Sequence, residues 1–118
     1  MYYLGIDLGG TNIAVGIVDE QLNIVKKGKV PTGAHRENEL VIRDMAELCA
    51  RLLAEEGISL DEVAYAGIAT PGIADNSTGV VVYSNNLHFH NFPIAKTLQK
   101  YLPVKKVLIA TSVRTIGE

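Results

Sequence analysis

One short segment of the sequence combines an aspartate, two glycines and a threonine in a pattern suited to phosphate chemistry. Residues 5–12 read GIDLGGTN, which predicts a strand that ends near Asp7 and turns at the two glycines. Gly9 and Gly10 permit positive φ and leave backbone N–H groups unshielded, so this turn can cradle phosphate oxygens. The Thr11 hydroxyl adds one donor, and the Asp7 carboxylate could hold a water molecule on Mg²⁺.

The same turn also fits a simpler interpretation, in which the glycines serve only the geometry of a tight hairpin and Asp7 is an ordinary polar residue. Short glycine motifs arise often by chance. The turn has no Gly-Lys-Ser/Thr of a P-loop, and it does not match GxGxxG. The residues alone therefore leave both interpretations open.

Two later loops carry residues suited to a polar ligand. Thr70, Pro71 and Gly72 predict a sharp turn after a buried strand, at the carboxyl edge where α/β proteins bind ligands. Asn86 offers a donor and an acceptor in one side chain, which suits the hydroxyls of a sugar. Alternatively, the first loop only ends a strand, and Asn86 with its neighbour Asn85 only forms an Asx turn.

The remaining candidate ligands predict no metal site. His88 and His90 lie two residues apart in an extended segment, so both rings would face one side. No third ligand is evident nearby, so we expect no metal there. Cys49 is the single cysteine, which excludes an internal disulfide and fits a reducing compartment. Its place on an apolar helix face predicts a small core residue.

Three apolar segments at the start of the chain predict an antiparallel meander. They are Tyr2–Leu8, Asn12–Asp19 and Ile24–Pro31, joined by short turns. Both faces of the second segment are apolar or small, which predicts a strand covered on both sides. The third segment contains three lysines at positions 26–29, as in a solvated edge strand that discourages pairing.

A helix and a mixed sheet are predicted for the rest of the chain. Over Glu37–Glu56, apolar residues recur with the 4-3-4 spacing of one helix face, and Gly57 follows as a C′ residue. A helix that leads into a strand indicates a crossover, and so a mixed α/β sheet. The later elements are predicted as a strand over Glu62–Ala69, a short strand over Val80–Tyr83, a loop over Ser84–Pro93, a helix over Ile94–Leu102 and a strand over Val104–Ala110.

The composition predicts one folded cytoplasmic domain. The chain has 118 residues, of which 47% are hydrophobic and 20% charged, so it can bury a core and is not disordered. A net charge of −2 gives no basic footprint for nucleic acid. No apolar run is long enough for a membrane span, and no secretory signal is visible. The scarcity of charge predicts a surface kept for a partner or a second domain.

Three segments, in order, resemble the ROK family of sugar kinases, which belongs to the hexokinase/actin-like ATPase superfamily. GIDLGGTNIAVGIVDE at residues 5–20 is similar to the family's phosphate-binding strand-turn-strand. GIATPGIAD at 67–75 is similar to its GxxxPGxxD loop, and YSNNL at 83–87 with FPI at 92–94 resembles its PNL-(x)n-PL sugar loop. The resemblance runs from about Tyr3 to Ala110 and implies a ribonuclease-H-like domain with flanking helices.

The resemblance also implies an activity and a set of binding residues. It implies ATP- and Mg²⁺-dependent transfer of a γ-phosphate to a hexose, with glucose as the first expectation. Asn86 would bind a sugar hydroxyl, beside a pocket lined by the turn at 70–72. The residues implied for Mg-ATP are Asp7, Gly9, Gly10, Thr11 and Asn12. The zinc site of many ROK proteins is a His/Cys cluster in the second lobe, and this sequence contains no such cluster.

The sequence departs from the family after its last predicted strand. ROK kinases carry an Asn-Asp pair there, whose aspartate is the general base, but this chain has Thr111 and Ser112. A serine cannot replace a carboxylate as base at neutral pH, and a positioned base contributes roughly 10²–10⁴-fold in rate. We therefore expect residues 1–118 to form a single N-terminal kinase lobe, without the second lobe and without activity of its own.

Three alternatives remain at this level. ROK proteins include sugar-responsive transcriptional repressors, but their helix-turn-helix domain would precede a first strand that here begins at Tyr2. The chain could instead be a non-enzymatic half-domain that pairs with itself as a homo-oligomer. It could also belong to another branch of the superfamily, such as an activator ATPase or an acetate-kinase-like enzyme. Pro71, Gly72 and Asn86 favour the ROK family over that branch.

Overall fold

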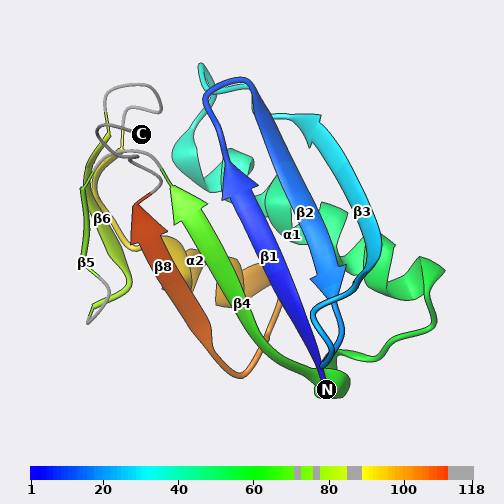
Figure 1. Cartoon of the computed structure of the whole chain (residues 1–118). Coiled ribbons are helices and arrows are strands. Elements are labelled where there is room, and N and C mark those ends of the chain that lie inside the picture. The colour runs from blue at the N-terminus through cyan, green and yellow to red at the C-terminus, as the bar shows by residue number, and fades with distance from the viewer. Residues whose placement is uncertain (71–72, 76–77, 85–88, 112–118) are drawn as a thin grey trace, which may run out of the picture.

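A five-stranded mixed sheet organises the chain. The computed structural model describes residues 1–70, 73–75, 78–84 and 89–111. The strands of this sheet are β1 (Tyr2–Leu8), β2 (Asn12–Val18), β3 (Ile24–Pro31), β4 (Val63–Thr70) and β8 (Val107–Thr111). β1, β2 and β3 are antiparallel neighbours, whereas β4 and β8 run parallel to β1. The order β3-β2-β1-β4-β8 confirms the predicted mixed α/β sheet (Figure 1).

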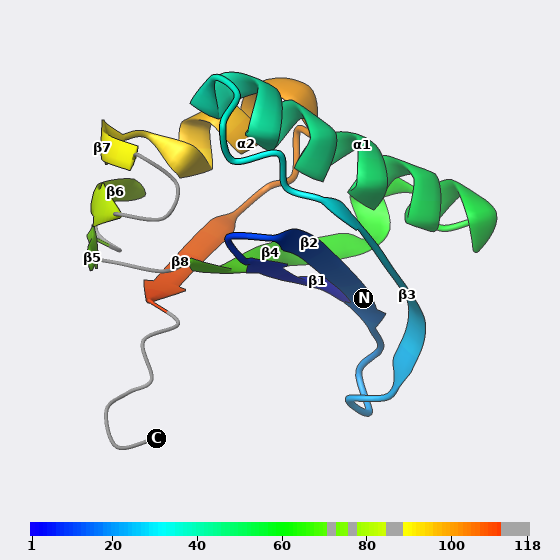
Figure 2. The ribbon, with the colours of Figure 1, turned by 90° about the horizontal axis from the view of Figure 1, so that it is seen from above.

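Both helices lie on one face of this sheet (Figure 2). They are α1 (Asn38–Glu55) and α2 (Ile94–Tyr101), and a short 3₁₀ helix, η1 (Leu60–Glu62), leads into β4. The buried stripe of α1 is the one that its spacing predicts, because apolar residues three and four positions apart share a face. Neither of these described helices combines the length and apolar composition that crossing a bilayer requires.

The core lies between the helices and the sheet. Alternate residues of the central strands enter it, including Leu4, Ile6 and Leu8 of β1 and Ile13 of β2. Cys49 of α1 is fully buried among them, as expected for a small core residue. Burial raises the pKa of the Cys49 thiol to about 12, so the thiol stays protonated at neutral pH.

A polar cluster ties the two helices together at their surface. The Lys100 ammonium group donates to the Glu39 carboxylate over 2.6 Å, and the Tyr101 hydroxyl donates to the same oxygen. The hydrogen bond from Lys100, followed by that from Tyr101, lowers the pKa of Glu39. The contribution of Glu39 to stability is therefore present above its unfolded pKa and lost as the pH falls through the lower folded value.

The opposite face of the main sheet is open among the described residues (Figure 2). The prediction that the second strand is covered on both sides is therefore wrong. Ala14, Gly16 and Val18 give β2 an apolar second face, but they are only half-buried. Gly16 pairs with Gly5 of β1, and Gly5 pairs with Gly67 of β4, so a row of three glycines crosses the open face.

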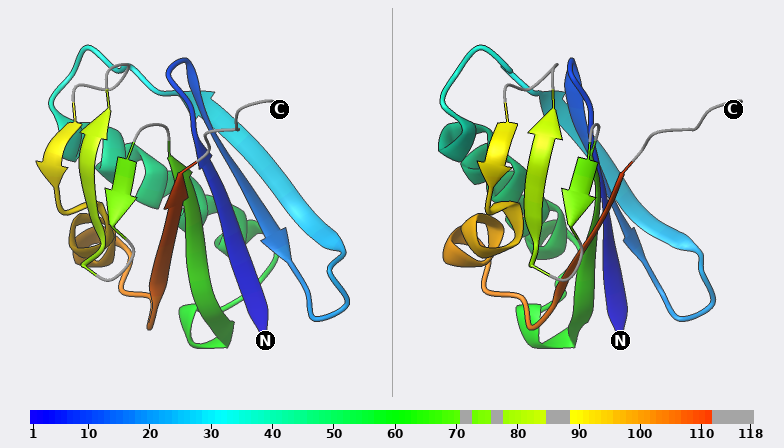
Figure 3. Two further views of the ribbon diagram at one scale, coloured as in Figure 1. Left: turned by 60° about the vertical axis from the view of Figure 1, so that its left-hand side comes forward. Right: turned by 90° about the vertical axis from the view of Figure 1, so that its left-hand side faces the viewer.

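A second, smaller sheet lies beside β8, as the yellow-green strands in Figure 3 show. Its strands, in the order β5-β6-β7, are β5 (Ile73–Asp75), β6 (Val80–Ser84) and β7 (Phe89–Phe92). The predicted loop over Ser84–Pro93 is therefore wrong in part, because its end pairs antiparallel with β6. The strand over 73–75 was not predicted.

The lysine-rich segment forms an edge strand, as predicted. β3 ends the sheet order, and Lys27 and Lys29 are exposed. Lys26 is half-buried and points to the helix side, where its Nζ lies 3.3 Å from Oε1 of Glu55. Charge along an exposed strand disfavours pairing with another chain at this edge.

Candidate functional site

The glycine turn joins β1 to β2 and is the most exposed part of the candidate site. The Gly9 N–H donates to the Asn12 carbonyl over 3.0 Å and closes the turn. Gly10, Thr11 and Asn12 are exposed. Outside strand pairing, the N–H groups of Gly10 and Thr11 make no hydrogen bond with the described residues, which leaves them free to bind an anion.

Close approach, and not positive φ, favours glycine at position 9. Gly9 and Gly10 are absent from the described glycines that have positive φ, so that part of the expectation is wrong. A Cβ on Gly9 would lie 3.0 Å from the Asn12 carbonyl oxygen, closer than a side chain tolerates without a shift. The hairpin therefore closes tightly because residue 9 has no side chain.

The parallel strands bring the turn and the end of β4 at Thr70 to one edge of the sheet (Figure 1). Asp7 near the end of β1 is in register with Ala69 of β4, and Thr70 is in register with Thr111 of β8. Carboxyl ends of parallel strands are the usual position of ligands in such sheets. Thr70 itself is fully buried, since its side chain lies on the helix-facing side of β4.

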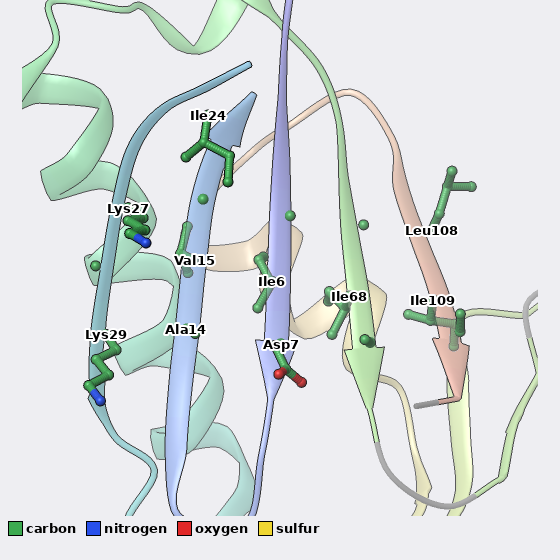
Figure 4. A pocket seen from close by; sticks show the side chains of 16 residues that line it. Ile6, Asp7, Ala14, Val15, Ile24, Lys27, Lys29, Ile68, Leu108 and Ile109 are labelled. Atoms are coloured by element: carbon green, nitrogen blue, oxygen red, sulfur yellow. The ribbon is translucent and has the colours of Figure 1, made fainter. Parts of the chain in front are cut away.

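Asp7 points away from the helices, into the open face (Figure 4). The residue is exposed, and its carboxylate makes no hydrogen bond or ion pair with the described part of the chain. Its register neighbours are Ala14 and Ala69, which leave space above it. An unpaired carboxylate oxygen with room for a hydrated ion fits the preference of Mg²⁺ for oxygen ligands and retained water.

A shallow hollow of about 1070 Å³ covers the open face in front of Asp7. Its floor consists of small residues, among them Gly5, Gly16 and Gly67. Lys27 and Lys29 stand on its β3 side, so positive charge lines one rim while Asp7 provides the negative charge (Figure 4).

Part of the predicted site lies outside the described residues. This applies to Pro71, Gly72, Asn86 and Ser112, and to His88 of the His-x-His pair. Among the residues that the structure describes, no three His, Cys, Asp or Glu side chains gather as a metal site.

Thr32, which follows β3, contacts the glycine turn and was not found from the sequence. It is fully buried, and its hydroxyl donates to the Gly9 carbonyl over 2.8 Å. Its backbone N–H donates to the Thr11 carbonyl over 2.8 Å. A threonine at the end of a strand has no distinctive local pattern, so only the fold reveals this contact.

Known proteins resemble this chain over most of its length. The sequence model of the ROK family matches residues 3–116. A glucokinase from Thermotoga maritima is 39% identical over 98 residues, which cover 82% of this chain and 29% of that protein. The crystal structure of a ROK hexokinase from Thermus thermophilus is 31% identical, with a TM-score of 0.81, over 94% of this chain and 35% of that one.

A ROK family glucokinase from Streptomyces griseus, crystallised with glucose and AMPPNP, has the same fold. It is 25% identical with a TM-score of 0.81, and the match covers 94% of this chain and 33% of that one. The chain thus spans about a third of the length of the relatives it matches.

Proposed function

This chain belongs to the ROK family, and from that membership we propose that it forms the N-terminal lobe of an ATP-dependent hexose kinase. The observation that carries the proposal is the edge where the exposed glycine turn, the Asp7 carboxylate, which is unpaired among the described residues, and the end of β4 come together. Relatives named glucokinase, one of them crystallised with glucose and AMPPNP, support glucose and ATP as the first ligands to test.

In this proposal the glycine turn binds phosphate. The backbone N–H groups of Gly10–Asn12 and the Thr11 hydroxyl steady the phosphate oxygens, while the Gly9 N–H closes the turn on the Asn12 carbonyl. Such a site suits a reaction catalysed mainly by positioning and electrostatics. Asp7 holds water on Mg²⁺, and the room beside Ala14 and Ala69 fits such an ion. When bound, Mg²⁺ neutralises charge on the phosphates.

The loops after β4 and β6 are proposed to form the sugar site. Asn86 supplies a donor and an acceptor for a hydroxyl, and the turn Pro71-Gly72 lines the pocket. Because the Thr70 side chain is fully buried, we assign to Thr70 the placing of this turn and not direct contact with the sugar.

The catalytic base is absent from the position where the family carries it. Ser112 follows β8 in place of the aspartate, and its hydroxyl is not a base at neutral pH. We therefore expect the purified 118-residue chain to show no sugar-dependent ATP turnover in a coupled assay. Calorimetric titration of the same preparation with glucose and with ATP separately measures whether either half of the site binds. Sugar-dependent ATP turnover by the chain contradicts the assignment of an inactive lobe. If neither glucose nor ATP binds, the proposed binding site is contradicted.

The open face of the sheet is proposed as a contact surface for a second lobe or a second copy. A Cβ on Gly5, Gly16 or Gly67 would meet no atom of the described residues closer than 3.9 Å, so packing within the described part of the chain does not need these glycines. Glycine within a strand often marks a place where another backbone approaches closely. Ile24, 64% exposed, adds a large apolar side chain at the rim.

Self-association through this face is a second candidate role, and Ile24→Glu tests it. We expect concentration-dependent dimerisation in sedimentation velocity, and we expect Ile24→Glu to raise the dissociation constant at least about tenfold because burial of isoleucine contributes roughly 1.5–3 kcal/mol. Leu22→Glu is the matched control, since Leu22 is 79% exposed but does not line the hollow. A monomer at every concentration, or equal effects of both substitutions, argues against this face as the dimer interface.

A further inference from the structure

We infer that Thr32 is a positioning residue for the glycine turn, held in place by Arg36 and Asp44. The inference rests on the phosphate-binding role proposed for that turn and adds the device that sets its shape.

Thr32 binds the turn at two points, on either side of its exposed part. Its hydroxyl donates to the Gly9 carbonyl and its N–H donates to the Thr11 carbonyl, each over 2.8 Å. Each peptide unit is planar and trans, so its carbonyl and the following N–H point in opposite directions. Fixing the Gly9 carbonyl therefore fixes the Gly10 N–H, and fixing the Thr11 carbonyl fixes the Asn12 N–H.

The consequence is that the Gly10 and Asn12 N–H groups point away from Thr32. Neither Gly9 nor Gly10 restricts its own φ and ψ through a Cβ, so a two-glycine turn has many conformations to lose. A phosphate site made of N–H groups depends on their being oriented in advance, because ordering them on binding would reduce affinity. Thr32, which follows the end of β3 and lies 23 residues from Gly9, orients these N–H groups before a ligand binds.

Arg36 anchors Thr32 to the first helix. Its Nη2 donates to the Thr32 carbonyl over 2.9 Å and to Asp44 Oδ2 of α1 over 2.7 Å, while its Nε donates to the Gly33 carbonyl over 3.3 Å. Both partners of the ion pair are largely covered, with 27% and 28% of their side chains exposed. Gly33 has φ +61°, which is strained for a residue with a side chain, and a Cβ there would lie 2.6 Å from Arg36 Nε, so a substitution would displace the guanidinium group.

The turn is thus connected to α1 through Thr32, Arg36 and Asp44. Thr32 makes its contacts with Gly9, Thr11 and Arg36 through three different atoms, its hydroxyl, N–H and carbonyl, so the hydroxyl can be removed while the two backbone contacts remain. That separation allows a role in orienting the turn to be distinguished from a general role in holding the end of β3.

The test compares Thr32→Val, which loses the hydroxyl at nearly constant shape, with Thr32→Ser, which keeps it. Thr97→Val is the matched control, because the Thr97 hydroxyl also donates to a backbone carbonyl, that of Pro93, over 2.8 Å. Two quantities are measured on the ¹⁵N-labelled 118-residue chain. They are the backbone order parameters of residues 9–12 and the dissociation constant for Mg-ATP.

We expect Thr32→Val to lower the order parameters of residues 9–12 below about 0.6. We also expect it to weaken Mg-ATP binding about five- to tenfold, as for loss of one neutral hydrogen bond. Thr32→Ser should restore both quantities, and Thr97→Val should change neither. A rigid turn with unchanged affinity in Thr32→Val overturns the inference and leaves the proposed function standing. A different result would be that the unsubstituted chain binds no Mg-ATP but Thr32→Val still makes residues 9–12 disordered. That result supports the positioning role of Thr32 and contradicts the proposed phosphate site.

Asp44→Asn provides a second variant should Thr32→Val fail to fold. It weakens the anchor from outside the turn and leaves Thr32 intact. We expect a smaller loss of order in residues 9–12 and a smaller loss of affinity, both in the same direction. Unchanged order parameters in a folded Asp44→Asn chain overturn the part assigned to Arg36 and Asp44.

Discussion

Asp7→Asn is expected to remove the Mg²⁺-dependent part of ATP binding. The substitution keeps the shape of the side chain but removes the charge that would hold water on the ion, and loss of such an outer partner costs roughly 10–100-fold in metal affinity. Asp7 is exposed and lies between small neighbours, so little change in stability should accompany the effect. Calorimetric titration with ATP, once with Mg²⁺ and once with EDTA, measures directly how much Mg²⁺ increases the affinity for ATP.

Asp19→Asn is the matched control for charge. It changes the net charge by the same amount, but Asp19 lies in the β2–β3 turn, where its Oδ1 accepts hydrogen bonds from the N–H groups of Gln21 and Asn23. We expect Mg²⁺ to increase the ATP affinity of this variant as much as it does for the unsubstituted chain. If Mg²⁺ still increases the ATP affinity of Asp7→Asn, or if this effect of Mg²⁺ is lost equally in Asp19→Asn, the assignment of Asp7 as the magnesium partner is contradicted.

Gly79→Ala is expected to lower the free energy of unfolding by about 2–5 kcal/mol. Gly79 has φ +73°, where an L-residue costs roughly 1–2 kcal/mol. Its Cβ would also lie 2.7 Å from the Cβ of Ala95 on α2, and such overpacking costs roughly 1–3 kcal/mol. The Gly79 carbonyl accepts a hydrogen bond from the Ala95 N–H over 3.1 Å, so the two segments cannot separate freely. Urea denaturation measures the loss.

Gly57→Ala separates the two contributions to this loss. Gly57 has φ +67° after the end of α1, but a Cβ there would meet nothing within 4 Å. We expect Gly57→Ala to lower the free energy of unfolding only by the cost of the positive φ, about 1–2 kcal/mol. Equal losses in the two variants would show that close packing between Gly79 and α2 does not contribute.

The parts of the fold that sequence could predict are those fixed by local patterns. The β1–β2–β3 meander and the stripe of α1 follow from alternation and helical spacing, and the observed ends differ from the expected ones by at most one residue. The strand β7 could not be found in this way, because Phe89–Phe92 is interrupted by His and Asn. It becomes a strand through pairing with β6, with Val81 opposite Phe92.

Of the candidate site, the sequence predicts only the exposed, contiguous part. The Asp7 and glycine-turn pattern lies within eight residues, and its residues do lie together at one sheet edge. Thr32 lies 23 residues from Gly9, whose carbonyl it contacts, and no local sequence pattern links two residues so far apart. Likewise, small residues on β2 look the same in sequence whether a face is covered or open, so the open face became evident only from the arrangement of the helices.

The connectivity of β1 has a consequence for the order of events during folding. Its contact with β2 needs only a short hairpin, whereas its contact with β4 joins Asp7 to Ala69, more than sixty residues along the chain. Closing the longer loop costs more entropy, and contacts of that range form late. At about 5–20 residues per second of synthesis, the turn leaves the ribosome several seconds before Thr70. We therefore expect the half of this edge proposed to bind phosphate to take its shape first, and the half proposed to bind sugar to be completed against it.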